Sequence, residues 1–365
     1  MHILHLYKDY HPIVGGIENH IKTLAEAQAA AGHTVTVLVT NPGGQAAEEM
    51  LNGVHVMRVP RMATVASTPL TLYFPAVLRR IKADITHLQF PYPIGEICQY
   101  FSGRRPYVIS YQSDIVRGSQ QAFLRLYRPL LRRVLRGAAC ILASSQNYID
   151  SSPYLQPVAA RCQVVPLGIH PQPFLDAVPA HPPSQSLRLL FVGRHRYYKG
   201  VDDLLRAVKS LDVELWIAGS GPMRPEWEGL AADLALGERV RFLGDVADRD
   251  LPALYASADV FVLPSNARSE AFGIVLLEAM AAGLPCITTE LGTGSSFIVQ
   301  DGVTGLVVPP RDPPALARAI ASMQSGPGLR KQLGQAGRAR LLEAFTLEKM
   351  VQRVEAVYSN CSPNS

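Results

Sequence analysis

Short hydrophobic runs alternate with longer amphipathic stretches along the first half of the chain. The runs lie at 2–7, 34–40, 83–89, 107–111 and 140–145. Short apolar runs predict strands, and the periodic stretches between them predict helices. This alternation indicates a parallel sheet covered by helices on both faces.

The same alternation restarts after a segment that is rich in proline. Residues 171–186 contain five prolines and little periodicity, which predicts a linker. Hydrophobic runs return at 187–193, 213–219, 239–244, 259–264, 286–289 and 305–309. We therefore predict an α/β protein with two Rossmann-like, doubly wound domains, at 1–170 and 187–345, that face a central cleft. A C-terminal helix and tail at 346–365 are expected to pack back on the first domain.

The composition narrows the class of protein. Hydrophobic residues make up 48% and charged residues 18% of the 365 positions, which is typical of a soluble globular protein. No run of 18 apolar residues is present, and the N-terminus has a strand-like run without a signal-peptide core. The five cysteines stand singly, which argues against a zinc site or a disulfide framework and favours the cytoplasm.

The net charge of +5 is unevenly distributed. Residues 115–149 contain no Asp or Glu, while Arg125, Arg128, Arg132 and Arg136 follow one another at steps of three or four. On a helix these arginines share one face. That face either is solvated on an ordinary packed helix or rests on an anionic membrane, which would place the protein peripherally at the inner membrane face. No aromatic platform interleaves with the basic residues, so we expect no nucleic-acid partner.

No metal or other cofactor is predicted. The ten histidines show no ligand spacing. The D-x-D at 248–250 precedes a helical stretch, where Asp248 or Asp250 is predicted to cap the helix rather than bind a metal.

Two junctions between a strand and a helix carry residues that suit a phosphate. At the first, Gly15 and Gly16 open a helix, where the backbone can approach an anionic ligand. The G-x-G-x-x-G fingerprint is missing there, which argues against a nicotinamide-dependent oxidoreductase. At the second, Arg194 and Lys199 leave a strand beside glycines and are placed to face a diphosphate.

A third junction lies in the stretch ARSEAFGIVLLEAMAAG. Phe272, Gly273 and Ile274 would present unpaired N–H groups to an anion at the start of a helix. Glu270 precedes that helix, and Glu278 lies in its otherwise apolar middle. Because an unpaired buried carboxylate is costly, Glu278 either finds a cation or a wet edge, or holds the hydroxyls of a ligand. A sugar nucleotide carries both hydroxyls for the carboxylates and phosphates for the cations.

The two glutamates form an E-x7-E pair within SEAFGIVLLEAMAAGLPCITTE, followed by DGVTGLVVPPRDPPALARAI. These stretches strongly resemble the retaining glycosyltransferases of family 4. The segments GGIE, ADITHLQ, VGRHRYYKG and LYASADVFVLPS extend the resemblance over most of the chain. The resemblance implies the GT-B fold, a nucleotide-sugar donor, and no requirement for a metal. It also implies that the leaving diphosphate helps to deprotonate the acceptor, so that no protein nucleophile is needed.

The resemblance also implies roles for the residues at these junctions. Glu278 matches the glutamate that binds the ribose hydroxyls of the donor, and Glu270 matches the one that contacts hydroxyls of the donor sugar. Arg194 and Lys199 match the pair that neutralises the departing diphosphate, which lowers the barrier electrostatically. The glycine pair near the N-terminus matches the loop that approaches the donor.

Two stretches depart from the family pattern. VISYQSD places Gln112 where many relatives have a histidine, and Gln89 replaces the second histidine of an H-x-H, while His87 is kept. Gln112 can hydrogen-bond to a hydroxyl but cannot take a proton, so we predict that Gln112 and His87 contact the sugar or the acceptor. Asp114 is a candidate substitute for the missing base. The second departure is ELGTGSSFIV, where many relatives have a G-G-then-Glu stretch.

The YYKG turn, SYQSDIV and ELGTGSS look most like the mannosyl and rhamnosyl transferases of bacterial O-antigen and polysaccharide assembly. We therefore expect a hexosyltransferase that moves mannose or rhamnose from a GDP-linked sugar to a hydroxyl of a glycan or lipid-linked acceptor. The alternatives are a UDP-sugar-dependent transferase, a GT-B epimerase or phosphorylase, and a non-catalytic nucleotide-sugar-binding protein. The joint presence of Glu270, Arg194 and Lys199 argues against the last of these.

Overall fold

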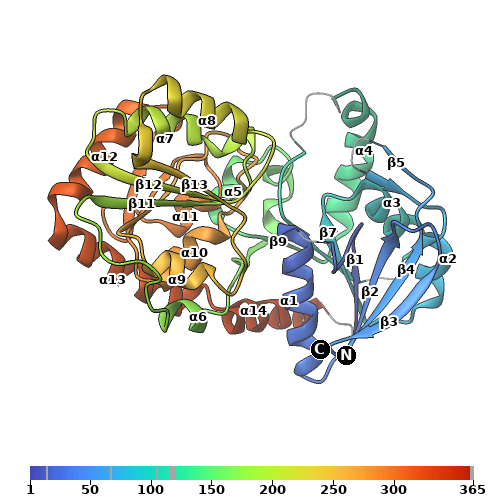
Figure 1. Ribbon diagram of the computed structural model, residues 1–365. Helices are drawn as coiled ribbons and strands as arrows, with labels where there is room; N and C mark the ends of the chain where they lie inside the picture. The colour runs from blue at the N-terminus through green and yellow to red at the C-terminus, as the bar shows by residue number, and fades with distance from the viewer. Residues whose placement is uncertain (14, 66–67, 104–105, 116–120, 362–365) are drawn as a thin grey trace. The chain divides into compact units, whose positions relative to one another are not determined.

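The chain forms two compact units in a computed structural model. The structure describes residues 1–13, 15–65, 68–103, 106–115 and 121–361, with the side chains of 121–126 left out. Unit 1 comprises Met1–Val165 with Met350–Ser365, and unit 2 comprises Pro166–Lys349. Each unit is built on a sheet that carries helices on both faces (Figure 1).

Unit 1 contains an eight-stranded sheet in the order β10-β9-β8-β7-β1-β2-β4-β3. Its strands are β1 (His2–Leu6), β2 (Thr34–Asn41), β3 (Ala47–Leu51), β4 (Val54–Pro60), β7 (Ile85–Phe90), β8 (Tyr107–Tyr111), β9 (Cys140–Ala143) and β10 (Cys162–Val164). The central strands β1, β7 and β8 are buried along nearly their whole length, as unbroken apolar runs require in a sheet covered on both sides. The polar strand β3 is exposed at the edge and pairs antiparallel with β4.

The remaining elements of unit 1 are mostly helices. They are α1 (Gly16–Ala30), α2 (Phe74–Arg80), α3 (Pro93–Ser102), α4 (Gln121–Gly137), α5 (Gln146–Ser151) and the 3₁₀ helix Gln156–Arg161. A small antiparallel hairpin joins β5 (Ala63–Val65) to β6 (Thr68–Leu70).

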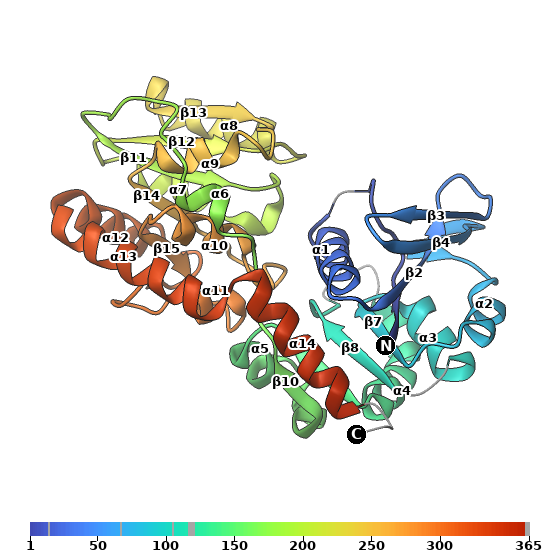
Figure 2. The same cartoon turned by 90° about the horizontal axis from the view of Figure 1, so that it is seen from below.

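The last helix, α14 (Leu347–Cys361), begins in unit 2 and contributes most of its length to unit 1. Met350, Val354, Val357 and Tyr358 recur at helical spacing and are each about 1% exposed, so one face of the helix is buried. In unit 1, α14 lies next to α1, where Tyr358 receives a hydrogen bond from Gln28 (Figure 2).

Unit 2 contains a six-stranded parallel sheet in the order β13-β12-β11-β14-β15-β16. Its strands are β11 (Leu187–Val192), β12 (Val213–Ala218), β13 (Val240–Gly244), β14 (Val260–Leu263), β15 (Cys286–Thr289) and β16 (Gly305–Val308). Successive strands after β11 are added on one side as far as β13, and β14 then pairs on the other side of β11. The strand order therefore reverses between β11 and β14, and in such a sheet ligands bind beyond the carboxyl ends of the strands at that point.

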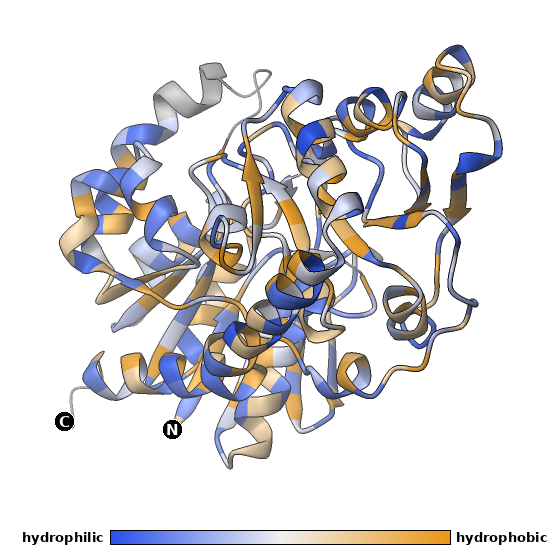
Figure 3. Cartoon of the chain, turned by 90° about the vertical axis from the view of Figure 1, so that its left-hand side faces the viewer, coloured by the Kyte–Doolittle hydropathy of each residue, from blue (hydrophilic) through white to orange (hydrophobic). Residues whose placement is uncertain are grey.

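Helices surround this second sheet. They are α6 (Gln172–Leu175), α7 (Val201–Ala207), α8 (Arg224–Asp233), α9 (Leu251–Ala256), α10 (Ile274–Ala281), α11 (Gly294–Ile298), α12 (Pro313–Ser325) and α13 (Pro327–Ala344), with 3₁₀ turns at Tyr197–Lys199 and Gly237–Arg239. Figure 3 shows the strands as largely hydrophobic, whereas the helices carry hydrophobic and hydrophilic residues side by side. This contrast reflects strands buried on both faces and helices buried on one.

The predicted α/β class with two parallel sheets is confirmed, and the predicted strands lie within two residues of the observed ones. Four short elements of unit 1, the strands β3, β5, β6 and β10, have too few apolar residues to stand out in the sequence, and the longer β4 was also missed. Segment 171–186, predicted as a linker, belongs to unit 2 and begins with α6.

Candidate functional site

The turns that follow β11 and β14 meet at the carboxyl edge of the unit 2 sheet. β11 and β14 are hydrogen-bonded neighbours, so the loops that leave them lie side by side. The main-chain N–H of Asn266 donates to the carbonyl of Tyr198 across 2.8 Å, which ties the two loops together. Side chains from both loops can therefore act on one ligand group.

An ion pair joins these loops. The Nζ atom of Lys199 lies 2.7 Å from Oε2 of Glu270, and the two side chains are only 10% and 9% exposed. The hydroxyl of Ser265 donates to the same Oε2 atom across 2.8 Å. A buried ion pair loses hydration on both sides, so the additional hydrogen bond from Ser265 helps to stabilise the carboxylate.

A glycine makes this loop geometry possible. Gly200 follows Lys199 and has φ of +65°, a left-handed conformation that glycine adopts without strain. A side chain there would place its Cβ 2.0 Å from the carbonyl oxygen of Pro264. Gly200 therefore allows the loop after β11 to pass against the loop after β14.

The divergent ELGTGSS segment supports the loop that carries Glu270. The hydroxyl of Thr293 donates to the main-chain carbonyl of Glu270 across 2.8 Å. Gly294 packs so closely on this loop that an added Cβ would lie 2.6 Å from the Cα of Phe272. The segment thus holds the glutamate loop in place.

Glu278 finds a neutral partner. Its Oε2 atom accepts a hydrogen bond of 2.7 Å from the hydroxyl of Tyr255 on α9, and the side chain is half-buried. Burial raises the pKa of Glu278, the Tyr255 hydrogen bond lowers it, and the negative charge of Asp248 raises it again. Among the described residues, no cation forms an ion pair with this carboxylate. Predicting the actual partner would have required knowing that α9 lies against α10.

The main chain that precedes α10 follows the expected course. Gly273 is the N-cap residue with φ of +91°, and α10 begins at Ile274. Phe272 is buried at 5% exposure, and Ile274 is half-buried. The predicted trio therefore surrounds the N-terminus of the helix that carries Glu278, and Glu270 lies just before it.

Arg194 and its neighbour His195 point to different environments. Arg194 is exposed and makes no hydrogen bond to the described residues, so its charge is available to a ligand. His195 is fully buried beside Trp227, with ring centroids 4.8 Å apart. Its main-chain N–H donates to the carbonyl of Ser220 across 2.7 Å, which fixes the turn that presents Arg194.

In unit 1, the predicted glycine pair lies at the start of α1. Gly15 is the N-cap residue and Gly16 the first residue of the helix. A Cβ on Gly15 would lie 2.1 Å from the carboxylate of the buried Glu18, whereas one on Gly16 would meet nothing within 4 Å. Gly15 therefore admits the Glu18 side chain, and Gly16 leaves open space beside the backbone.

Gln112 and Asp114 follow β8 and are half-buried. The side-chain amide of Gln112 donates to Gln89 across 3.3 Å. One carboxylate oxygen of Asp114 accepts hydrogen bonds from Tyr111 (2.8 Å) and Ser152 (2.6 Å). Asp114 is thus held in place by two hydroxyl groups.

The structure corrects the predicted contact by His87. This residue is 0% exposed, and its two ring nitrogens lie 2.5 Å from the Tyr358 hydroxyl and 2.7 Å from the Ser110 hydroxyl. Burial lowers the pKa of His87 well below its ordinary value. The sequence could not show the contact between His87 and Tyr358, because the two residues are 271 positions apart. His87 is part of the interior of unit 1 and is not placed to meet a sugar.

The arginine-rich helix α4 has the predicted amphipathic character. Arg128, Arg132 and Arg136 are exposed, and Arg125 lies outside the described side chains. The opposite face is buried, and its members are Tyr127, Leu131, Val134 and Leu135. Tyr127 donates a hydrogen bond to the fully buried carboxylate of Glu96 on α3, whose pKa burial raises to about 7.

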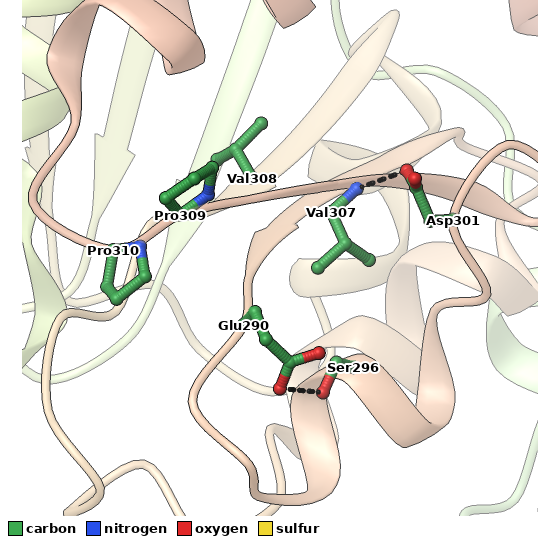
Figure 4. Close-up of a pocket in the computed structure, with 7 residues that line it drawn as sticks. All are labelled: Glu290, Ser296, Asp301, Val307, Val308, Pro309 and Pro310. Carbon is green, nitrogen blue, oxygen red and sulfur yellow. Dashed lines mark hydrogen bonds between the residues drawn. The ribbon is translucent and has the colours of Figure 1, made fainter.

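A hollow of about 510 Å³ lies at the carboxyl ends of β15 and β16 (Figure 4). Its lining consists of Glu290, Ser296, Asp301, Val307, Val308, Pro309 and Pro310. Glu290 accepts a hydrogen bond from Ser296 across 2.8 Å, and Asp301 accepts one from the N–H of Val307 across 2.9 Å. These carboxylates are therefore used to hold their own loops.

Two absences apply to the described part of the chain. It contains no group of three or more His, Cys, Asp or Glu side chains that could hold a metal ion. None of its helices is both long enough and apolar enough to cross a membrane.

Asp250 is the N-cap residue of α9, but its side chain makes no capping hydrogen bond.

The chain matches known proteins over nearly its full length. Residues 14–172 match the family described as Glycosyltransferase Family 4, and residues 178–340 match Glycosyl transferases group 1. D-rhamnosyltransferase WbpZ of Pseudomonas aeruginosa is 36% identical over 355 residues, which cover 95% of this chain and 92% of the relative. O-antigen chain mannosyltransferase C of Escherichia coli is 34% identical over 374 residues, which cover 98% of each chain. The structure of sucrose-phosphate synthase from Thermosynechococcus elongatus superposes with a TM-score of 0.81 at 24% identity, over all of both chains.

Proposed function

This chain belongs to glycosyltransferase family 4, and from that premise we propose that it transfers mannose or rhamnose from a GDP-linked donor to a hydroxyl of a glycan or lipid-linked acceptor in cell-surface polysaccharide synthesis. The sugar class is supported by the two relatives, a D-rhamnosyltransferase and an O-antigen chain mannosyltransferase. The GDP linkage is supported by the resemblance of YYKG, SYQSDIV and ELGTGSS to transferases of these sugars.

The ion pair of Lys199 and Glu270 is the observation that carries this proposal. It places a cation and a carboxylate 2.7 Å apart at the reversal of strand order, where a donor's diphosphate and sugar would both lie. Lys199 and the exposed Arg194 would neutralise the leaving diphosphate. Glu270 would accept hydrogen bonds from the hydroxyls of the sugar, and Glu278 from those of the ribose.

Main-chain and amide groups would complete the donor and acceptor contacts. Phe272, Gly273 and Ile274 offer the N–H groups at the start of α10 to the diphosphate. Gly16, with Gly15 before it, offers backbone beside open space. Gln112 and Asp114 follow β8 and supply an amide and a carboxylate to the sugar or the acceptor; we assign no such contact to His87.

The proposed reaction retains the configuration of the sugar. A bond forms between the acceptor oxygen and the anomeric carbon, while the bond from that carbon to the diphosphate oxygen breaks. The acceptor proton passes to the leaving diphosphate, which departs as GDP. The task of this chain is to position the two substrates and stabilise the developing negative charge.

Thermal unfolding with a panel of nucleotides tests the donor. GDP and GDP-mannose are expected to raise the Tm of the wild type and to have little effect on Glu278→Ala. A rise with UDP and UDP-glucose instead would replace the donor and keep the reaction. If none of the nucleotides changes the Tm, the proposal is wrong. GDP-mannose binding without transfer of mannose to any lipid-linked oligosaccharide would favour the non-catalytic binding protein.

We further propose that unit 1 contacts an anionic membrane through α4. Arg128, Arg132 and Arg136 are exposed on it, and unit 1 also exposes large apolar side chains such as Met62 (61%) and Leu72 (77%). Cations attract anionic lipid, and exposed apolar groups can enter the interface. Vesicles that contain anionic lipid should retain the protein at low salt, and replacing the three arginines by Gln should abolish retention. Equal retention of this variant would refute the contact.

A further inference from the structure

Both glutamates of the E-x7-E pair are held in the same way. Tyr255 donates its hydroxyl to Oε2 of Glu278 across 2.7 Å, and Ser265 donates its hydroxyl to Oε2 of Glu270 across 2.8 Å. Both donors are 0% exposed. Within the described residues no hydrogen bond reaches the Oε1 atom of either glutamate, and neither Oε1 is a buried atom without a partner.

We infer that Tyr255 and Ser265 are positioning residues for the donor: each fixes one carboxylate oxygen and directs the other toward hydroxyl groups of the ribose or the sugar. The inference rests on the proposed function and adds two residues to it. A carboxylate with one fixed oxygen loses less rotational freedom when it binds a ligand, and this pre-organisation strengthens binding.

Both hydroxyls are themselves rigidly supported. The ring of Tyr255 packs against Phe174 of α6 and Phe261 of β14, at centroid distances of 5.6 Å and 5.5 Å. The main-chain carbonyl of Ser265 accepts a hydrogen bond from the hydroxyl of Thr289 on β15. Because neighbouring elements fix each donor, each donor in turn can fix a carboxylate.

The carboxylates of Glu270 and Glu278 differ in the charge of the groups that hold them. Within the part of the chain that the structure describes, Glu270 also has the Lys199 ammonium as a partner, whereas the side chain of Glu278 has only the neutral hydroxyl of Tyr255. Asp248 is a charged group that acts on Glu278, and Arg338, one of the four cationic residues of the neighbouring α13, lies beside Gly283 beyond the end of α10. Burial raises the pKa of Glu278 and the Tyr255 hydrogen bond opposes that rise, so removing this hydroxyl should raise the pKa further.

The first test compares Tyr255→Phe with the wild type in nucleotide binding. The probes are GDP and 2′,3′-dideoxy-GDP, or the uridine pair if the thermal panel selects UDP. The wild type should prefer the ribonucleotide. Tyr255→Phe should bind it roughly tenfold more weakly, the effect of one hydrogen bond to a charged group, and should lose most of that preference. Tyr107→Phe is the matched control, because its buried hydroxyl donates to the carbonyl of Val134 in unit 1.

The pH dependence of binding is the readout that a purely structural effect would not change. Glu278 accepts hydrogen bonds best when it is ionised, so nucleotide binding is lost as the pH falls through its pKa. In Tyr255→Phe this loss should begin at a higher pH than in the wild type. The profile of Tyr107→Phe should coincide with that of the wild type.

The second test uses Ser265→Ala. Its affinity for GDP should equal that of the wild type, while its affinity for GDP-mannose should fall roughly tenfold because the sugar contact is weakened. Ser257→Ala is the matched control, since its buried hydroxyl donates to the carbonyl of Ala253 in the same unit.

The outcomes separate this inference from the function on which it rests. If the wild type prefers the ribonucleotide and Tyr255→Phe keeps the full preference at every pH, the positioning inference is wrong and the function stands. If the wild type binds no nucleotide, both are wrong. Equal losses in the control variants would also overturn the inference, because they would reflect stability alone.

Discussion

Unit 1 and unit 2 have similar architecture, yet they use their buried polar side chains differently. In unit 1, His87 contacts Ser110 and Tyr358, and Tyr358 receives a hydrogen bond from Gln28, which in turn bonds to His5. All five are 6% exposed or less and lie inside the unit. In unit 2, Lys199, Ser265 and Glu270 form a buried polar cluster at the carboxyl edge of the sheet, and within the described residues the Oε1 atoms of Glu270 and Glu278 accept no hydrogen bond.

This difference indicates which buried polar groups serve the fold and which serve a ligand. The unit 1 network joins β1, β7, β8 and α1 to α14, so its hydrogen bonds attach the C-terminal helix to the unit. The unit 2 cluster leaves acceptor capacity unused, and unused capacity in a low-dielectric site is worth most when a ligand fills it. Mutations should therefore affect stability in the first region and binding in the second.

The largest expected effect is on catalysis in unit 2. Lys199→Ala removes the buried cation from the diphosphate position and leaves Glu270 without its charge partner, so we expect kcat/KM for sugar transfer to fall about 100- to 1,000-fold. The exposed Lys209 provides the control, and Lys209→Ala should retain full activity. Normal turnover by Lys199→Ala would contradict the claim that the buried polar cluster of unit 2 serves catalysis.

In unit 1 the matching change should affect stability alone. Tyr358→Phe leaves Nδ1 of His87 and the side-chain amide of Gln28 without their hydroxyl partner, which should lower the free energy of unfolding by about 1–3 kcal/mol. Urea denaturation measures this change, and nucleotide affinity of the folded variant should equal that of the wild type. Weaker nucleotide binding by this variant would contradict the division between the two regions.

Acid should weaken unit 1 through its buried histidines. Burial lowers the pKa of His5 and His20 to about 4. The unfolded chain therefore takes up protons first as the pH falls below about 6.5, and stability present above that pH is lost toward pH 4. Glu96 opposes this trend, because its pKa of about 7 in the folded state favours folding at low pH.

His20→Leu sharpens this prediction, because the ring makes no hydrogen bond to the described residues and its Nε2 is a buried atom without a partner. At pH 5 the variant should be more stable than the wild type by about 2 kcal/mol, and the gain should shrink toward pH 7. Thermal unfolding across this range measures it. A gain that does not vary with pH would mean that His20 does not titrate in this way.

The smallest effect is expected at the surface of unit 1. Arg132→Gln on α4 changes an exposed side chain, so the free energy of unfolding should change by less than about 0.5 kcal/mol. Urea denaturation in the absence of lipid provides the measurement. A larger loss would show that this face of α4 contributes to the fold.

The sequence by itself determined five of the eight strands in the unit 1 sheet, the six strands of unit 2, the division into two α/β halves, and the E-x7-E stretch with its family. These features are local, since hydrophobic periodicity and short motifs are written in neighbouring residues. The sequence also placed Lys199, Glu270 and Gly273 at the ends of strands, where a parallel sheet gathers its ligand contacts.

Only the tertiary structure decided which side chains meet. Lys199 and Glu270 are 71 residues apart, Tyr255 and Glu278 are 23 apart, and His87 and Tyr358 are 271 apart. No local pattern specifies these pairs, because they depend on which strands are neighbours and on how the helices pack against them. The same reason explains why His87 looked like a ligand contact and proved to be part of the interior, and why the partner of Glu278 was a tyrosine.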